Sequence, residues 1–144
     1  MLTIECKICS GEADSEFKRR EVWSNDIWRL TASTYKNVKG FCYLEPKRHI
    51  PYITDLDGIE AREFGSIISK ITSAIKKACN AKLVYVYIFG GHIPHLHVHF
   101  APHTDKDIYY SKIVSDENLI GEEILNQFEI DNLIKAISSN INLL

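Results

Sequence analysis

Three histidines occupy alternate positions in the sequence, at His95, His97 and His99. In a β-strand successive side chains point to opposite faces, so this spacing predicts three imidazoles on one face and apolar residues on the other. Neighbouring imidazoles on that face would lie about 6.6 Å apart, at about 3.3 Å of rise per residue. One histidine can then point at a reacting atom while its neighbours donate protons or support it, which makes the segment a candidate active site.

Three kinds of chemistry can use such a row of histidines. A binuclear metallohydrolase needs carboxylate ligands, but no aspartate follows the row before Asp105, and the barrel that usually houses a His-x-His metal pair needs about 250 residues. A small metal-binding barrel would recruit a further histidine or carboxylate from a neighbouring strand. Nucleophilic catalysis, in which an imidazole nitrogen attacks phosphorus and water later displaces it, needs a neutral histidine held in one tautomer.

A second group able to do chemistry is the pair Cys6 and Cys9, spaced as Cys-x-x-Cys. Charge follows the first four residues at once, which argues against a secretory signal and predicts a reducing, cytoplasmic setting. There the pair indicates metal binding or redox chemistry before a disulfide. A redox pair of the thioredoxin kind opens a helix after a strand, yet only five residues precede Cys6, so the alternatives are half a zinc site or two buried thiols. Cys42 and Cys79 are expected to pack in the core.

Composition limits the classes of protein that fit. The chain has 144 residues, 45% of them hydrophobic, which suits one domain able to bury a core without disulfides. Its 17 basic and 19 acidic side chains give a net charge of −2 without a basic block, which argues against a dedicated nucleic-acid binder. The longest apolar run, residues 83–89, is far shorter than the roughly 20 residues that span a membrane, so we expect a soluble protein without a membrane partner.

The elements that position these residues follow from periodicity. Strands are predicted at residues 22–35 (one or two strands), 41–44, 83–89 and 94–101. Pro46 is expected to end the second of these segments, and the continuous apolar run at 83–89 is typical of a central strand. A 3.6-residue period predicts a helix between Asp57 and Asn80, capped by Asp55 or Asp57. Residues 116–144 are predicted to form a helical tail, best between 131 and 138. The expected fold class is α+β with a mainly antiparallel sheet.

Two segments carry a resemblance to a known family. Residues 90–102 read GGHIPHLHVHFAP, which resembles the His-φ-His-φ-His-φ-φ signature of the histidine triad superfamily of nucleotide hydrolases and transferases. Residues 39–50 read KGFCYLEPKRHI, similar to the strand and Pro-Lys-Arg-His turn of that family, and the long helix also belongs to its pattern. The resemblance covers residues 6–103. It implies a single histidine-triad-like domain over residues 1–144, a nucleotide substrate and a two-fold homodimer.

The resemblance also implies roles for individual residues. His97 would be the nucleophile that becomes nucleotidylated, and His99 would contact the phosphate and assist the leaving group. His92 falls where the family has a polar residue that contacts phosphate. In the zinc-binding branch, which includes hexose-1-phosphate uridylyltransferases, the corresponding ligands of a structural zinc would be Cys6, Cys9, His49 and His95. Residues 1–20 would then form an N-terminal zinc-binding segment.

The sequence departs from the family pattern at several positions. A histidine that often lines the active site is replaced by Phe41, and the acidic residue that often grips the ribose falls near Ser33. The usual Asn-x-Gly before the glycines is absent, and an arginine after the final proline is His103. The sequence therefore predicts a nucleotide hydrolase or transferase that works through a nucleotidyl-histidine. The alternatives are a nucleotide-binding regulatory module with little turnover and a metallohydrolase ligated by the histidine row.

Overall fold

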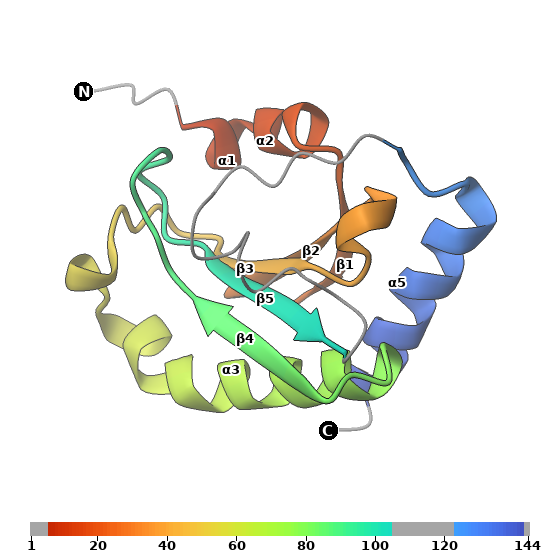
Figure 1. Cartoon of the computed structure of the whole chain (residues 1–144). Helices are drawn as coiled ribbons and strands as arrows, with labels where there is room; N and C mark the ends of the chain where they lie inside the picture. The colour runs from red at the N-terminus through yellow and green to blue at the C-terminus, as the bar shows by residue number, and fades with distance from the viewer. Residues whose placement is uncertain (1–5, 105–122, 143–144) are drawn as a thin grey trace.

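One five-stranded sheet organises the computed structural model, which describes residues 6–104 and 123–142 (Figure 1). The strands are β1 (Arg19–Ser24), β2 (Trp28–Ser33), β3 (Cys42–Pro46), β4 (Leu83–Tyr87) and β5 (Val98–His103). Their spatial order is β1-β2-β3-β5-β4, and every neighbouring pair is antiparallel. The predicted α+β class with an antiparallel sheet is confirmed.

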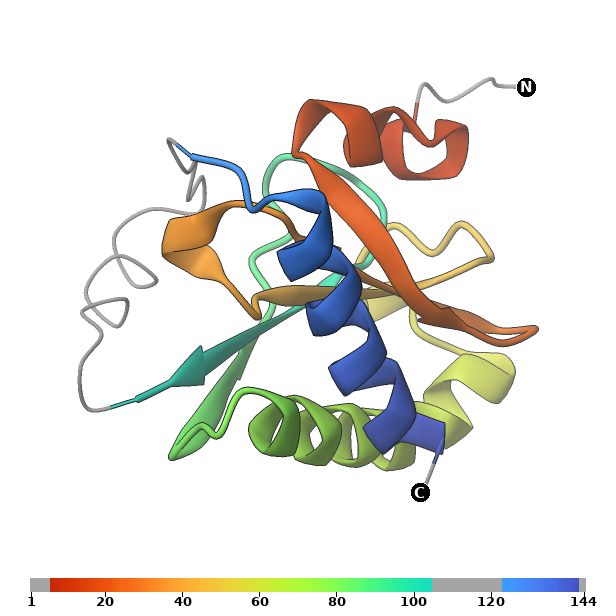
Figure 2. The ribbon, with the colours of Figure 1, turned by 90° about the vertical axis from the view of Figure 1, so that its right-hand side faces the viewer.

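The helices divide between the two faces of the sheet. The long helices α3 (Gly58–Ala78) and α5 (Gln127–Asn142) pack on one face and against each other. The short helices α1 (Lys7–Ser10) and α2 (Glu12–Glu16) lie on the opposite side (Figure 2). Single 3₁₀ turns, η1 (Lys36–Val38) and η2 (Ile53–Asp55), complete the described elements. None of the helices in these residues is both long and apolar enough to cross a membrane.

Strand alternation decides which residues enter the main core. Trp28, Leu30 and Leu44 point toward α3 and α5 and are fully buried. The indole N–H of Trp28 donates to Glu63 on α3 at 3.2 Å, so its one polar atom is satisfied. The intervening residues face the opposite side of the sheet, which we call the outer face. All the candidate chemistry lies on that outer face or beside it.

Several predicted boundaries are close to those observed. Residues 22–35 form two strands, of which the first begins earlier, at Arg19. The helix predicted between Asp57 and Asn80 is α3, with Asp57 at its N-cap position, and Asn80 follows its end with a φ of 51°. Helix α5 contains the predicted stretch 131–138 and is longer at both ends. Residues 116–122 and 143–144 of the expected tail lie outside the described residues.

Two strand predictions are wrong in detail. Residues 83–89 form an edge strand rather than a central one, because β5 lies between β4 and β3. The strand predicted at 41–44 is β3, which begins at Cys42 and ends at Pro46 as predicted. The strand predicted at 94–101 begins only at Val98, because the Leu96 N–H donates to Ile50 O at 2.7 Å instead of joining the β3 ladder. The histidine row therefore straddles the end of a strand.

Candidate metal centre and active site

Four side chains from three separate parts of the chain meet at one end of the sheet. Cys6 and Cys9 come from α1, His49 follows β3, and His95 precedes β5. Their ligand atoms all lie within 4.8 Å of one another. The structure therefore assembles the four residues that the resemblance singled out as metal ligands.

Local structure prepares the two thiols for this meeting. Cys6 is the N-cap of α1, and its Sγ accepts a hydrogen bond from the Cys9 N–H at 3.3 Å. Gly11 ends α1 with a φ of 85°, a conformation that glycine adopts without strain, and the chain turns there into α2. The turn that carries His49 is tied to α3, because the Arg48 guanidinium donates to Glu60 at 3.1 Å.

Four of the distances within the cluster are close to the edges of a tetrahedral metal site. His95 Nδ1 lies 3.3 Å from the Sγ of Cys6, 3.3 Å from the Sγ of Cys9 and 3.3 Å from His49 Nδ1. Cys9 Sγ lies 3.4 Å from His49 Nδ1. A tetrahedron with zinc–sulfur bonds of about 2.3 Å and zinc–nitrogen bonds of about 2.0–2.1 Å has edges of about 3.3–3.8 Å. The donor set and its spacing fit zinc.

Hydrogen bonding sets the tautomer of His95. Its Nε2 lies 2.8 Å from Pro46 O, and because a carbonyl oxygen only accepts, Nε2 carries the proton. The lone pair is then on Nδ1, which faces the cluster. Burial raises the pKa of the Cys9 thiol to about 11, and burial also lowers the pKa of His95. A bound cation would favour the thiolate and the neutral imidazole, so metal binding would release the thiol proton.

His97 stands next to the cluster but is oriented differently. Its Nδ1 lies 2.7 Å from the carbonyl oxygen of His95, so Nδ1–H donates and the lone pair is on Nε2. The same residue, His95, therefore offers its ring to the cluster and its main chain to His97. In the neutral ring this hydrogen bond selects one tautomer, with the proton on Nδ1, which is the form that a nitrogen nucleophile requires.

His99 lies within a group of aromatic rings on the outer face. The ring of Tyr87 stacks on it at 4.7 Å, that of Tyr43 meets it edge-on at 5.3 Å, and that of His97 lies 5.0 Å away. Burial, helped by the neighbouring His97, lowers the pKa of His99 to about 3, so the ring is neutral at pH 7. Its Nε2 is buried and has no hydrogen-bond partner among the described residues.

The predicted single face of three imidazoles is thus corrected. His95 is turned into the four-residue cluster, while His97 and His99 remain as a pair whose rings lie close together. The physical reason is that Leu96 bonds to the loop after β3 rather than to the ladder, so the period of two does not extend back to His95. His92 is exposed in the loop between β4 and β5 and lies outside the four-residue cluster.

Two of the departures from the family pattern, Phe41 and Ser33, are buried. Phe41 packs with Val38 and Ala101 in a small apolar cluster on the outer face. Ser33 Oγ accepts a hydrogen bond from the Tyr35 N–H at 3.3 Å. In this structure neither side chain presents a polar group to an open site.

Sequence reasoning missed the tyrosines around His99. The ladder pairs both Tyr43 and Tyr87 with His99, one from each neighbouring strand. The sequence places both tyrosines in predicted strands, but it does not give the strand register that brings them to His99.

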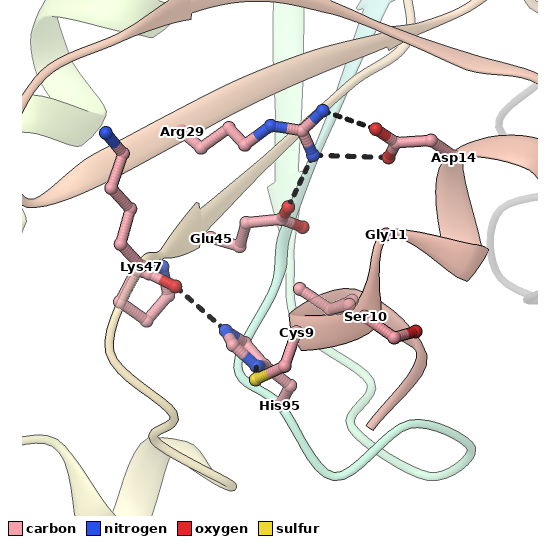
Figure 3. Close-up of a pocket in the computed structure, with 10 residues that line it drawn as sticks. Cys9, Ser10, Gly11, Asp14, Arg29, Glu45, Lys47 and His95 are labelled. Atoms are coloured by element: carbon pink, nitrogen blue, oxygen red, sulfur yellow. Dashed lines mark hydrogen bonds and ion pairs between the residues drawn. The ribbon is translucent and has the colours of Figure 1, made fainter. Parts of the chain in front are cut away.

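The sequence also gave no sign of a cavity of about 300 Å³ between α1 and the outer face. This cavity is lined by Cys9, Ser10, Asp14, Arg29, Glu45 and His95 among others (Figure 3).

Several solved structures share the fold of this chain. A hypothetical histidine triad nucleotide-binding protein from Sulfolobus tokodaii is 21% identical over 96% of this chain and 93% of its own, with a TM-score of 0.71. A histidine triad protein from Sinorhizobium meliloti is 16% identical over 90% and 93%, with a TM-score of 0.76. A Zn-bound histidine triad family protein from Mycobacterium smegmatis is 12% identical over 96% and 94%, with a TM-score of 0.66.

No protein-family model matches the sequence, and no curated protein matches it. Each of the three structures nevertheless spans at least 90% of both chains, so the similarity extends over the sheet and its helices rather than one motif. Identities of 12% to 21% carry the arrangement of elements rather than an activity. The fold of this chain is therefore that of the histidine triad proteins.

Proposed function

We propose that this protein is a zinc-containing histidine triad enzyme that hydrolyses or transfers nucleoside monophosphate groups through an adduct on His97. Its substrates would be nucleoside phosphoramidates, dinucleoside polyphosphates or related nucleotides. The observation that carries the proposal is the hydrogen bond from His97 Nδ1 to the His95 carbonyl, which leaves a lone pair on Nε2. The similarity to a structure described as nucleotide-binding supports the substrate class.

The reaction would proceed in two displacements. His97 Nε2 attacks the α-phosphorus, a nitrogen–phosphorus bond forms, and the bond to the leaving group breaks with its electron pair, which a proton from solvent neutralises. Water then attacks the same phosphorus, the nitrogen–phosphorus bond breaks with its pair returning to Nε2, and the proton lost by water passes to solvent. The product is a nucleoside monophosphate, or a transferred nucleotidyl group where another acceptor replaces water.

His99 would act in this reaction as a neutral group. Because burial lowers its pKa to about 3, an imidazolium that gives up a proton is not available near pH 7. A neutral imidazole can still donate one N–H to a phosphate oxygen, and the buried Nε2 needs such a partner. One of the surrounding rings must shift for a phosphate oxygen to reach that atom. His92 would donate a further hydrogen bond to phosphate from its exposed loop.

Zinc would be held by Cys6, Cys9, His49 and His95, with a structural role. When bound, it neutralises the two thiolates and ties the N-terminal segment, residues 1–20, to the sheet. His95 then keeps both its ring and its carbonyl in place, which holds the tautomer of His97. The Zn-bound state of the Mycobacterium smegmatis structure supports this assignment. A reducing cytoplasm suits the site because both cysteines must stay reduced.

Intact-mass analysis tests the adduct. The protein is exposed briefly to a panel of nucleoside phosphoramidates and dinucleoside polyphosphates and quenched at alkaline pH, where a nitrogen–phosphorus bond survives. We expect a mass increase equal to one nucleoside monophosphate group, mapped by peptide digestion to His97. Turnover without an adduct, or an adduct on another residue, would contradict the proposed nucleophile.

Elemental analysis tests the metal. Protein purified without added metal is expected to contain one zinc per chain, and Cys9→Ser is expected to lose it. Cys79→Ser is the matched control, because Cys79 packs beside the main core away from the cluster. Zinc missing from the wild type, or zinc retained in full by Cys9→Ser, would overturn the assignment.

A second candidate function is a nucleotide-binding module with little turnover. It is favoured by the enclosed Nε2 of His99 and by the buried side chains at Ser33 and Phe41. Nucleotides would then raise the melting temperature of the protein while no product is released.

A metallohydrolase whose metal is bound by all three histidines would require added divalent metal for activity. The bond from His97 Nδ1 to a carbonyl argues against that arrangement.

The proposed enzyme would be a homodimer. Strand β4 pairs only with β5 among the described residues and forms an edge of the sheet. Leu83 and Val86 on this strand are exposed, and an exposed apolar edge favours pairing with another copy. Light scattering of the purified protein is expected to give about 33 kDa, twice the chain mass of 16.5 kDa. A monomer at micromolar concentration would contradict this.

A further inference from the structure

A network of four charged residues, two of them buried and two partly buried, lies directly beside the cluster of Cys6, Cys9, His49 and His95. Arg19 donates to Glu45 at 3.2 Å and to Asp14 at 2.8 Å. Arg29 donates to Glu45 at 3.1 Å and also to Asp14 (Figure 3). The two guanidinium groups thus bridge the same two carboxylates, and the four charges sum to zero. Arg29 makes a further, outer contact with the exposed carboxylate of Glu21 at 2.7 Å.

Such a network is costly to bury. Only 2% of the Glu45 side chain and 5% of the Arg19 side chain are exposed. Removing paired charges from water costs several kcal/mol per ion, and apolar side chains of similar volume often stabilise a fold as well or better. A buried ion network is therefore better explained by the specific arrangement of helices and strands that it holds than by a gain in stability. The elements joined by this network are therefore the guide to its role.

The network connects the two halves of the ligand set. Asp14 lies on α2, and a single residue, Gly11, separates α2 from α1 and its two cysteines. Glu45 lies on β3 directly before Pro46, whose carbonyl accepts the hydrogen bond from His95 Nε2. Figure 3 shows Glu45 and Arg29 on one side of the cavity and Cys9 and His95 on the other. The thiols are thus connected to the sheet through Asp14, and His95 is connected to it through Glu45 and Pro46.

Among the described residues, the α1–α2 segment has few other apolar anchors. Its buried apolar residues, Cys6, Ile8 and Ala13, form a cluster separate from the main core. Partly buried Phe17 and Ile93 are the apolar residues packed against that cluster. A segment held by so small an apolar contact would rely on the ion pairs and on the metal to stay against the sheet.

We propose that Asp14, Arg19, Arg29 and Glu45 are positioning residues for the metal site. The network holds Cys6 and Cys9 against His49 and His95 before the ion arrives, so that binding does not have to order the N-terminal segment. Glu45 also steadies the strand end whose carbonyl sets the tautomer of His95. The inference rests on the proposed zinc site and goes beyond it, because none of these four residues is a ligand. By thermodynamic reciprocity, a bound metal strengthens the network by the same factor.

Zinc transfer to a chromogenic chelator tests the inference. Zinc-loaded wild type, Glu45→Gln and Asp14→Asn are titrated with the chelator, and the zinc affinity of each is compared. We expect the two variants to bind zinc about 10- to 100-fold more weakly, the range found for residues that support metal ligands. Glu21→Gln is the matched control. It removes a carboxylate from the same Arg29, but that carboxylate is half exposed and outside the network, and its affinity is expected to stay within twofold of wild type.

A spectroscopic measurement separates positioning from loss of the fold. Cobalt(II) in the cluster gives tetrahedral visible bands in a folded site, and their position is expected to be the same in wild type and variants while the affinity falls. Asp14→Asn serves where Glu45→Gln fails to fold, because Asp14 is about a quarter exposed. Variants that bind zinc as tightly as wild type, or a control that weakens as much, would overturn the inference alone. A wild type that binds neither ion would overturn the zinc site and the inference with it.

Discussion

His95 and His99 lie four residues apart, belong to the same alternating pattern and are both buried, yet their surroundings are opposite. His95 is 1% exposed, donates from Nε2 to a carbonyl and turns Nδ1 toward two thiols and a second imidazole. His99 is 8% exposed, lies among aromatic rings, and has a buried Nε2 without a partner among the described residues. Ring nitrogens gathered with other donors suit a cation, whereas an apolar cage keeps an imidazole neutral.

His97 lies between these two environments and contacts both of them. Its main-chain neighbour His95 accepts the hydrogen bond that sets its tautomer, and its ring lies 5.0 Å from that of His99. Three histidines at alternate positions thus divide into a proposed metal ligand, a proposed nucleophile and a ring that burial keeps neutral. Residue type and spacing are shared, so the difference comes from what each ring contacts.

The largest effect is expected from His97→Gly. Removing the proposed nucleophile should lower hydrolysis of a fluorogenic nucleoside phosphoramidate by about 10⁴-fold or more. The zinc content should not change, because His97 Nδ1 is bonded to a carbonyl rather than to the cluster. Rate and zinc content are measured on the same preparation. Loss of zinc from this variant would contradict the assignment of His95, but not His97, to the metal cluster.

Removal of the metal is expected to give the next largest effect. Zinc at about a thousandfold over its dissociation constant stabilises the folded state by about 4 kcal/mol. A chain of this size should then lose roughly 8–16 °C in melting temperature on chelation or in Cys6→Ser. Calorimetry measures the shift, and Cys79→Ser should keep the full response to chelator. An unchanged melting temperature after complete metal removal would show that the cluster does not support the fold.

Acid stability tests the other side of the comparison, the apolar cage of His99. The folded pKa of about 3 lies below the unfolded value of about 6.5, so between these values only the unfolded chain takes up the proton. The free energy of unfolding therefore falls as pH falls, by about 1.4 kcal/mol per pH unit or about 2 kcal/mol at pH 5. Urea unfolding at pH 7 and pH 5 should show this loss, and His99→Gln should lack it.

The acid experiment is best made in a Cys9→Ser background, so that release of metal does not contribute to the pH dependence. His92→Gln is the control, because it removes a histidine that is exposed and lies outside the rings around His99. Equal slopes for wild type and His99→Gln would mean that the rings around His99 do not keep it neutral.

The smallest effect is expected from His92→Asn. This histidine is exposed and belongs to neither environment, so the free energy of unfolding should change by less than about 0.5 kcal/mol. Loss of one hydrogen bond to phosphate should lower kcat/KM by up to about tenfold. Steady-state kinetics measures the change. A wild-type kcat/KM would remove His92 from the phosphate contacts.

The local features of this chain could be read from its sequence because they depend on neighbours along the chain. Period-two and period-3.6 patterns predicted the antiparallel strands and α3, and Asp57 was foreseen at the N-cap position. The edge position of β4 could not be read in the same way. Its apolar run looks the same in a central strand, and only the pairing order shows that β5 separates it from β3.

The residues of the candidate site also fall into two groups, those that local motifs indicate and those that only the tertiary structure brings together. The four cluster residues came from a resemblance between short motifs, and the structure brings their ligand atoms together. Tyr43 and Tyr87 around His99, and Asp14 and Glu45 beside the cluster, carried no local signal. They reach the site through strand register and helix placement, which join residues far apart in the chain.

By itself the sequence determined that three imidazoles recur every second residue and that two thiols stand three apart, since spacing is a property of the chain alone. Tertiary structure alone decided which nitrogen of each ring carries the proton and what its lone pair meets. The position of the proton depends on Pro46 O for His95 and on the His95 carbonyl for His97, and the surroundings of His99 are set by two tyrosine rings. The physical reason is that an imidazole has two chemically distinct nitrogens, and only a three-dimensional neighbour distinguishes them.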